Sequence, residues 1–220
     1  MCFSPQADLV GGTVIMALGV DSLRHVQRRR DQLALASLPL LLGAHQIDEA
    51  FVWWGLQDHV PAQVGRVALW IFLVIAFVVL PVVVPLAVLT VDESRRRRWL
   101  IAPFVAVGSV VAVLLLNALV RNAFAARLAP YHLAYSLRLS DGLAVIALYV
   151  VAVCGSLLIS GHRPIAVFGV ANLVAVGVLA LLLVDGFASL WCAWAAVTSA
   201  AIAGHLRLTQ PGAEPRAQPR

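Results

Sequence analysis

Seven apolar segments, each about as long as a helix that crosses a lipid bilayer, restrict the folds open to this chain. A spanning helix needs about 20 mostly apolar residues to cross a hydrocarbon core about 30 Å thick. The segments cover residues 6–23, 33–57, 67–91, 99–120, 141–160, 164–184 and 187–207. We therefore predict an all-α, polytopic membrane bundle of about seven transmembrane helices over residues 1–208. The polar, proline-rich residues 209–220 are expected to form a disordered cytoplasmic tail.

The composition excludes a soluble enzyme. Apolar residues make up 61% of the 220 positions and charged residues 12%, whereas soluble domains carry about 25% charged residues. The basic residues are all arginines, and they stand in short clusters between the apolar segments. This pattern is typical of membrane topology rather than of a nucleic-acid-binding face. Membrane lipid, and not nucleic acid, is therefore the expected partner.

The arginine distribution predicts an orientation. Twelve of the 16 arginines fall on one side of a seven-helix topology, in clusters such as 24–30 and 95–98, and four fall on the other side. Cytoplasmic loops retain positive charge. The amino terminus is therefore expected outside and the carboxyl terminus in the cytoplasm.

The segment 33–57 carries the most polar residues at membrane depth. His45, Asp48 and Glu49 are spaced three and four residues apart and share one helical face, which Trp53 continues. Adjacent carboxyl groups in an apolar setting resist ionising together, because burial and mutual repulsion both disfavour the charged forms. One of the two acids is thus a candidate general acid, with His45 as its neighbour. The alternative is that these side chains only hydrogen-bond to one another and hold helices together.

Further aromatic and polar residues are predicted at the same outer level of the bundle. An aromatic belt explains some tryptophans, a helix cap explains Asp141, and a tight turn explains Asp185. Taken together, however, they predict an acid-bearing pocket with aromatic walls. The candidate substrate-binding residues are Trp53, Trp54, Trp191, Trp194, Asp8, Asp141 and Asp185.

The longest connection, residues 121–140, is expected to form an amphipathic stretch at the membrane interface. Its residues Tyr131, His132 and Tyr135 either cover the opening of the bundle or lie at the interface. Asn172, in the middle of the sixth segment, is expected to bond to a neighbouring helix.

Metal-binding motifs are missing from the sequence. There is no aspartate-rich segment for magnesium and diphosphate, and the histidines are scattered rather than placed as in HxxxH or HExxH. We therefore expect neither a metal nor a cofactor. A metal-dependent membrane hydrolase that uses His45 and the two acids remains a competing hypothesis.

Three stretches carry a family resemblance over nearly the full chain: MCFSPQADLVGG at the start, LPLLLGAHQIDEAFVWWGL, and FASLWCAWAA. The chain resembles a family of small bacterial polytopic membrane proteins with an MCFS start. Membrane-bound terpene cyclases of drimentine-type indole sesquiterpenoid pathways are similar proteins. The resemblance implies an isomerase of bacterial secondary metabolism in the cell membrane, acting on the farnesyl chain of a prenylated, tryptophan-containing diketopiperazine.

The residues and the resemblance together lead to one hypothesis and one alternative. The hypothesis is a metal-independent, proton-initiated terpene cyclase. Glu49 or Asp48 would protonate the lipophilic isoprenoid, and the tryptophans would shield the carbocation. The alternative is a carrier or sensor of a small lipophile or of protons, in which the same acids bind or relay.

Overall fold

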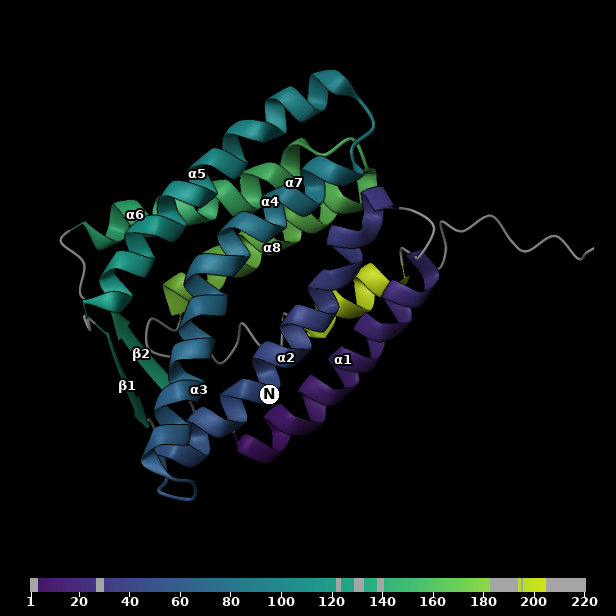
Figure 1. The fold of residues 1–220 in the computed structure, drawn as a ribbon. Helices are drawn as coiled ribbons and strands as arrows, with labels where there is room; N and C mark the ends of the chain where they lie inside the picture. The colour runs from purple at the N-terminus through teal and green to yellow at the C-terminus, as the bar shows by residue number, and fades with distance from the viewer. Residues whose placement is uncertain are drawn as a thin grey trace, which may run out of the picture.

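The computed structural model of the chain is mostly helical (Figure 1). It describes residues 4–26, 30–121, 124–128, 133–137, 141–182, 194 and 196–204. The helices are α1 (Pro5–Val26), α2 (Leu33–Leu56), α3 (Ala62–Val74), α4 (Leu80–Val91), α5 (Arg95–Val120), α6 (Gly142–Val150), α7 (Ser156–Ile159) and α8 (Arg163–Leu182). Shorter elements are η1 (Arg30–Gln32), η2 (Ile75–Val79), η3 (Val151–Gly155), β1 (Phe124–Leu128) and β2 (Leu133–Leu137). Residues 196–204 are also helical.

The helices coincide closely with the apolar segments of the sequence. Within the described residues, four stretches are long and apolar enough to cross a membrane: Pro5–Val26, Ala62–Val91, Arg95–Val120 and Gly142–Ile159. The second joins α3, η2 and α4, and the fourth joins α6, η3 and α7. The seventh segment is helical over 196–204, while the predicted tail lies outside the described residues. A mostly helical protein with several helices that could span a membrane is thus confirmed, and the count of seven spans stays a prediction.

Small residues bring α1 and α2 together as an antiparallel pair, which Figure 1 shows side by side. A Cβ atom added to Gly43 would lie 2.6 Å from the Met16 backbone nitrogen and 2.9 Å from the Gly12 carbonyl oxygen. At Gly19 an added Cβ would meet the Leu40 backbone. In lipid, helices associate largely through such close backbone packing. These contacts fix which residues of α1 lie beside the polar part of α2.

A proline shapes the joint between α3 and α4. In the π-helical turn η2, the Leu80 N–H bonds to the Ile75 carbonyl, five residues back. The next residue in that register is Pro81, which has no N–H, so the Ala76 carbonyl receives no bond from it. The Tyr149 hydroxyl of α6 donates a hydrogen bond to that carbonyl oxygen at 2.9 Å. A side chain from another span therefore satisfies the backbone group that the proline leaves without a donor.

The connection 121–140 contains a β-hairpin, which the sequence did not predict. Strands β1 and β2 pair antiparallel, with Phe124 opposite Leu137 and Leu128 opposite Leu133. Leu133 is fully buried, and it packs in a cluster with Trp53 and Phe72. The interfacial interpretation missed this element because it considered the polarity of the segment and not the pairing of its two halves.

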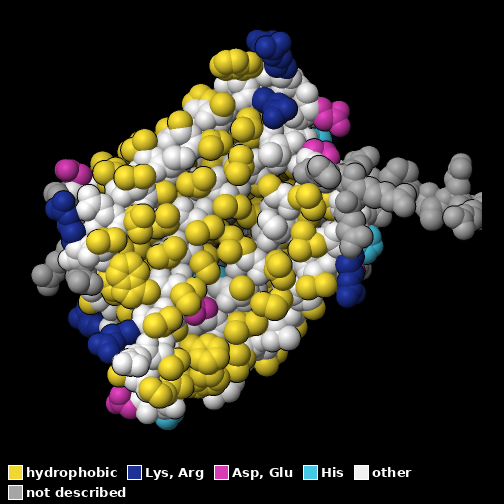
Figure 2. All heavy atoms as spheres, in the orientation of Figure 1, with side chains coloured by type: hydrophobic (Ala, Val, Ile, Leu, Met, Phe, Trp, Pro, Cys, Tyr) yellow, Lys and Arg dark blue, Asp and Glu magenta, His cyan; other side chains and the backbone are white. Residues whose placement is uncertain are grey.

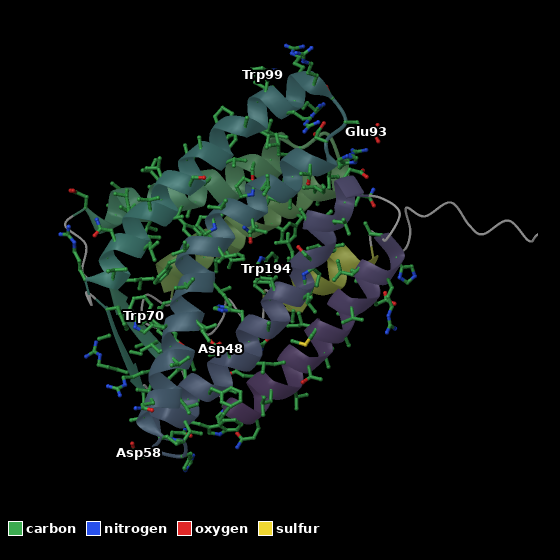
Figure 3. The ribbon with its side chains drawn as sticks, viewed as in Figure 1. Asp48, Asp58, Trp70, Glu93, Trp99 and Trp194 are labelled. Carbon is green, nitrogen blue, oxygen red and sulfur yellow. The ribbon has the colours of Figure 1, made fainter. Side chains whose placement is uncertain are left out.

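Buried polar contacts join two turns at one end of the bundle. The Asp92 carboxyl accepts hydrogen bonds from the Gly161 N–H at 2.7 Å and the Ser94 N–H at 3.3 Å. Arg97 donates to the Ile159 carbonyl at 3.3 Å. Figure 2 shows basic side chains at this end, and Figure 3 shows Glu93 and Trp99 there, with Asp58 at the opposite end. The loops after α4 and α7 therefore lie together, as the arginine pattern predicts, while the side of the membrane stays a prediction.

Candidate functional site

The polar residues of α2 point into the bundle. Glu49 is completely buried, Gln46 is 1% exposed and His45 is 7% exposed. His45 and Glu49 lie four residues apart, and Leu42 precedes His45 by three, so the three share one inward face of the helix. Carboxyl, imidazole and amide groups are thus all enclosed by protein at one level of α2.

Aromatic rings cover this polar cluster. The His45 ring stacks on Phe72 of α3, with centroids 4.1 Å apart, and Phe72 stacks on Tyr135 of β2, with centroids 4.7 Å apart. The Tyr135 hydroxyl donates a hydrogen bond of 3.4 Å to Glu49 Oε1. The buried Trp53 belongs to the same cluster of packed residues as Phe72 and Leu133. The hairpin therefore brings a phenol to the acid of α2, and the tyrosine that the sequence offered as a lid contacts the site directly.

Several polar atoms of the cluster have no hydrogen-bond partner among the described residues. They are His45 Nδ1, both amide atoms of Gln46 and Trp53 Nε1, and each of these atoms is buried. A buried donor or acceptor without a partner costs about 1–3 kcal/mol. Such a concentration of unmet groups around one acid is expected where a site binds water or a ligand. It argues against the alternative in which these residues only hold helices together.

Asp8 lies beside this cluster on α1. It is fully buried in the first turn of the helix. Gly12, one turn further along α1, approaches Gly43 and Ile47 of α2. Because the two helices run antiparallel, Asp8 lies level with the next turn of α2, the turn that contains Glu49. The site therefore receives a second carboxyl group from a second helix.

Asp48 points elsewhere, although it is adjacent to Glu49 in sequence. It is half-buried and lines a hollow of about 340 Å³ between α2 and α3. The two helix backbones come close where Gly55 faces Gly65, and the hollow extends along α3 from Gln63 and Val64, beside this contact, to Ile71. Exposed apolar side chains such as Val67 and Ile71 surround the carboxyl group. Figure 3 shows Asp48 between the helices, and Figure 2 shows an acidic side chain among hydrophobic ones there.

A separate apolar cavity of about 140 Å³ lies further along the bundle. Trp194 donates a hydrogen bond from Nε1 to Asn172 Oδ1 at 2.7 Å, and Asn172 Nδ2 contacts Cys154 Sγ at 3.3 Å. Asn172 thus bonds to neighbouring helices, as predicted. Figure 3 shows Trp194 between α2 and α4, and the surface is hollowed there in Figure 2. The lining residues are Leu35, Leu38, Leu42, Leu80, Val84, Tyr149, Val153, Leu157, Pro164, Ile165, Phe168, Asn172, Trp194, Thr198, Ala201 and Ile202.

The structure separates residues that the sequence assigned to one acid-bearing pocket. Trp53 packs at the acids, whereas Trp194 lines the apolar cavity and stacks on Phe168. Trp54 makes an edge-on contact with the exposed Phe51 and does not line the cavity. The prediction of a single tryptophan-lined pocket needs this correction, because helix packing turns neighbouring tryptophans to different sides.

Of the remaining predicted residues, the structure describes only Asp141, and it does not join the cluster. Asp141 is exposed at the start of α6 and makes no side-chain capping bond. Asp185 and Trp191 lie outside the described residues. In the part of the chain that the structure describes, no three His, Cys, Asp or Glu side chains converge in a way that could hold a metal ion.

The sequence reasoning missed Gln46 and Phe72. Gln46 directly follows His45 and precedes Asp48 by two residues, so its polarity in an apolar helix was a usable signal. Phe72 is one apolar residue in a long apolar run, and nothing in the sequence distinguishes it from its neighbours. Only the packing of α3 against α2 shows that its ring contacts both His45 and Tyr135.

Comparison with known proteins gives a family but no activity. No curated protein matches the chain, and no solved structure does. The family model that matches covers residues 1–217, which is nearly the whole chain. The protein therefore belongs to a family of unknown function (DUF6629).

Proposed function

We propose that this protein is a membrane-bound, metal-independent terpene cyclase that starts cyclisation by protonating an isoprenoid chain. The observation that carries the proposal is Glu49, a completely buried carboxyl group that accepts a hydrogen bond from Tyr135. Aromatic rings surround it, and an apolar cavity lies along the same helix. A carboxyl group enclosed by protein in this way is positioned to act as a general acid.

The reaction needs only groups of this chain. Glu49 transfers its proton to the terminal alkene of the substrate, and the alkene becomes a tertiary carbocation. A second double bond of the substrate attacks the cation and closes a ring. Trp53 and Tyr135 would stabilise the cation by roughly 0.5–2 kcal/mol per ring, whereas both faces of Phe72 are already covered by His45 and Tyr135. Loss of a proton to a base such as Asp8 regenerates an alkene, so the product is an isomer of the substrate.

The resemblance of the sequence suggests the substrate class and the setting. The proposed substrate is the farnesyl chain of a prenylated, tryptophan-containing diketopiperazine in indole sesquiterpenoid biosynthesis. The proposed location is the bacterial plasma membrane, which the chain spans several times with its amino terminus outside. No cofactor takes part.

Mass spectrometry of fed cells tests this proposal. Cells that express the chain and receive a farnesylated indole diketopiperazine should form a product of unchanged mass, shifted retention and fewer olefinic protons. The Glu49→Gln variant should lose this product by about 100-fold or more, since general acid catalysis contributes about 10²–10⁴-fold. Glu93→Gln makes the same chemical change at an exposed position and should leave the product unchanged.

The Asp48→Asn variant distinguishes the role of Asp48 from that of the adjacent Glu49. Because Asp48 faces the hollow between α2 and α3, its loss should reduce the product much less than the loss of Glu49. Equal product from wild type and the Glu49→Gln variant would overturn the proposed acid. No product from any isoprenoid, with folded protein in the membrane, would overturn the activity.

The second candidate is a carrier or sensor of a small lipophile. The observation in its favour is that neither Asp48 nor Glu49 lines the apolar cavity, so a ligand there need not react. This function predicts that the bound lipophile is recovered unchanged after incubation, whereas the cyclase returns an isomer.

A further inference from the structure

The apolar cavity and the Glu49 cluster lie along one face of α2. Leu35, Leu38 and Leu42 line the cavity. His45 and Glu49 follow them on the same face of the helix, because all five residues are spaced alternately three and four positions apart. Since an α-helix rises 1.5 Å per residue, Glu49 lies about 10 Å beyond Leu42 along the axis. An elongated molecule that extended from the cavity along this face would pass Leu42 and His45 before it reached Glu49.

The opposite wall follows the same path. Leu80 and Val84 of α4 line the cavity across from α2. Further back in the continuous stretch Ala62–Val91, Phe72 stacks on His45. Leu42 and Leu80 pack together between the cavity and the stacked rings. Among the described residues, the Leu42–Leu80 contact and the His45–Phe72 pair lie between the two sites.

The lining of the cavity is suited to hydrocarbon. Its polar edge is internally satisfied, because the Trp194 indole N–H donates to Asn172 and the Asn172 amide reaches Cys154. The other lining residues are almost all apolar. An engineered apolar cavity of about 150 Å³ binds benzene, so 140 Å³ accommodates roughly one five-carbon isoprene unit.

We propose that this cavity is the subsite that holds one isoprene unit of the substrate's chain and selects the chain by its length. The terminal alkene points along α2 toward Glu49, and the rest of the chain leads out of the cavity between α2 and α4. This assignment rests on the proposed function. An apolar chain gains little free energy by leaving lipid for another apolar environment. Selection therefore depends on how well the chain fits the space between these walls.

Photoaffinity labelling of the full-length protein in lipid nanodiscs tests the subsite. The probe is a farnesyl chain that carries a diazirine, and all variants also carry Glu49→Gln, so that labelling does not depend on turnover. Val84→Phe places a ring in the cavity from α4. Leu86→Phe is its matched control, because Leu86 is 39% exposed on the same helix and does not line the cavity. Leu38→Ala enlarges the cavity from the other wall.

The expected labels lie on cavity-lining residues of α2, α4 and α8. Because the added ring occupies the space of the chain, labelling of Val84→Phe should fall by about tenfold or more. Leu86→Phe should be labelled like its parent. Leu38→Ala should shift the labelling preference of the protein toward a probe that is one isoprene unit longer. If Val84→Phe does not fold, the result for Leu38→Ala tests the subsite by itself.

Labels outside the cavity, or labelling that neither cavity variant changes, would overturn the subsite. The two proposals fail in different ways. Specific labelling without product from any isoprenoid would overturn the cyclase and retain a lipophile-binding cavity. Product formation in protein whose cavity is not labelled would overturn the subsite and retain the cyclase.

Discussion

The hydrogen bond from Tyr149 to the backbone at η2 predicts a stability effect that does not depend on the function. Replacing Tyr149 by Phe keeps the ring and removes the hydroxyl that donates to the Ala76 carbonyl. The π-helical register pairs Leu80 with Ile75, so the following donor would be Pro81, which has no N–H. Tyr149→Phe therefore leaves a carbonyl oxygen without its donor inside the bundle.

The size of the effect follows from this unmet acceptor. An unsatisfied buried carbonyl costs about 1–3 kcal/mol in soluble proteins. Hydrogen bonds between membrane helices average about 0.6 kcal/mol and reach about 1.7 kcal/mol. We expect Tyr149→Phe to lower the free energy of unfolding by about 1–2 kcal/mol, because Pro81 removes the backbone donor that would otherwise replace the hydroxyl.

A double-mutant cycle provides the decisive measurement. Pro81→Ala restores a backbone N–H that can bond to Ala76, so Tyr149→Phe in that background should cost close to nothing. Unfolding is followed by tryptophan fluorescence in mixed micelles, as a denaturing detergent replaces a mild one. Equal losses from Tyr149→Phe with and without Pro81 would refute the reasoning, because they would show that the hydroxyl acts independently of the proline.

Two further predictions concern packing and accessibility. Gly43→Ala should destabilise the protein by about 1–3 kcal/mol, because the new methyl group meets the α1 backbone near Gly12. Gly177 has open space around it among the described residues, so Gly177→Ala should stabilise the protein by about 0.5–1 kcal/mol through helix propensity. If melting experiments showed that both variants are stabilised or both are destabilised, the close approach of the α1 and α2 backbones at Gly43 would be contradicted. A lipid-soluble carbodiimide, which modifies accessible protonated carboxyl groups, should label Asp48 in its open hollow and spare the enclosed Glu49, as peptide mass spectrometry would reveal. The reverse labelling would show that the inward acid has been misassigned.

The sequence by itself determined the helices and the position of the candidate site along the chain. The lengths of the apolar segments predict helices, because a backbone in lipid must bond within its own segment. The structure places helices at these segments. The polar run from His45 to Glu49 also indicated the site, since charged groups within an apolar helix are costly and need a purpose or a partner. Asn172 was likewise predictable as an interhelical contact.

Tertiary structure decided which of these residues act together. Asp48 and Glu49 are adjacent, and successive residues of an α-helix point about 100° apart. The packing of α2 on α1 through Gly12 and Gly43 turns Glu49 inward and leaves Asp48 to the hollow beside α3. Spacing from His45 does not distinguish these two acids, because Asp48 and Glu49 follow it by three and four residues and lie on either side of its direction.

The partners of the acid depend on contacts between distant parts of the chain. Tyr135 reaches Glu49 only because β1 and β2 pair, and Phe72 reaches His45 only because α3 folds back on α2. An aromatic residue in an apolar run looks the same in sequence whether it faces lipid or a carboxyl group. Local sequence thus determines where helices form and how polar each one is, whereas the packing of helices against one another determines which polar and aromatic groups meet.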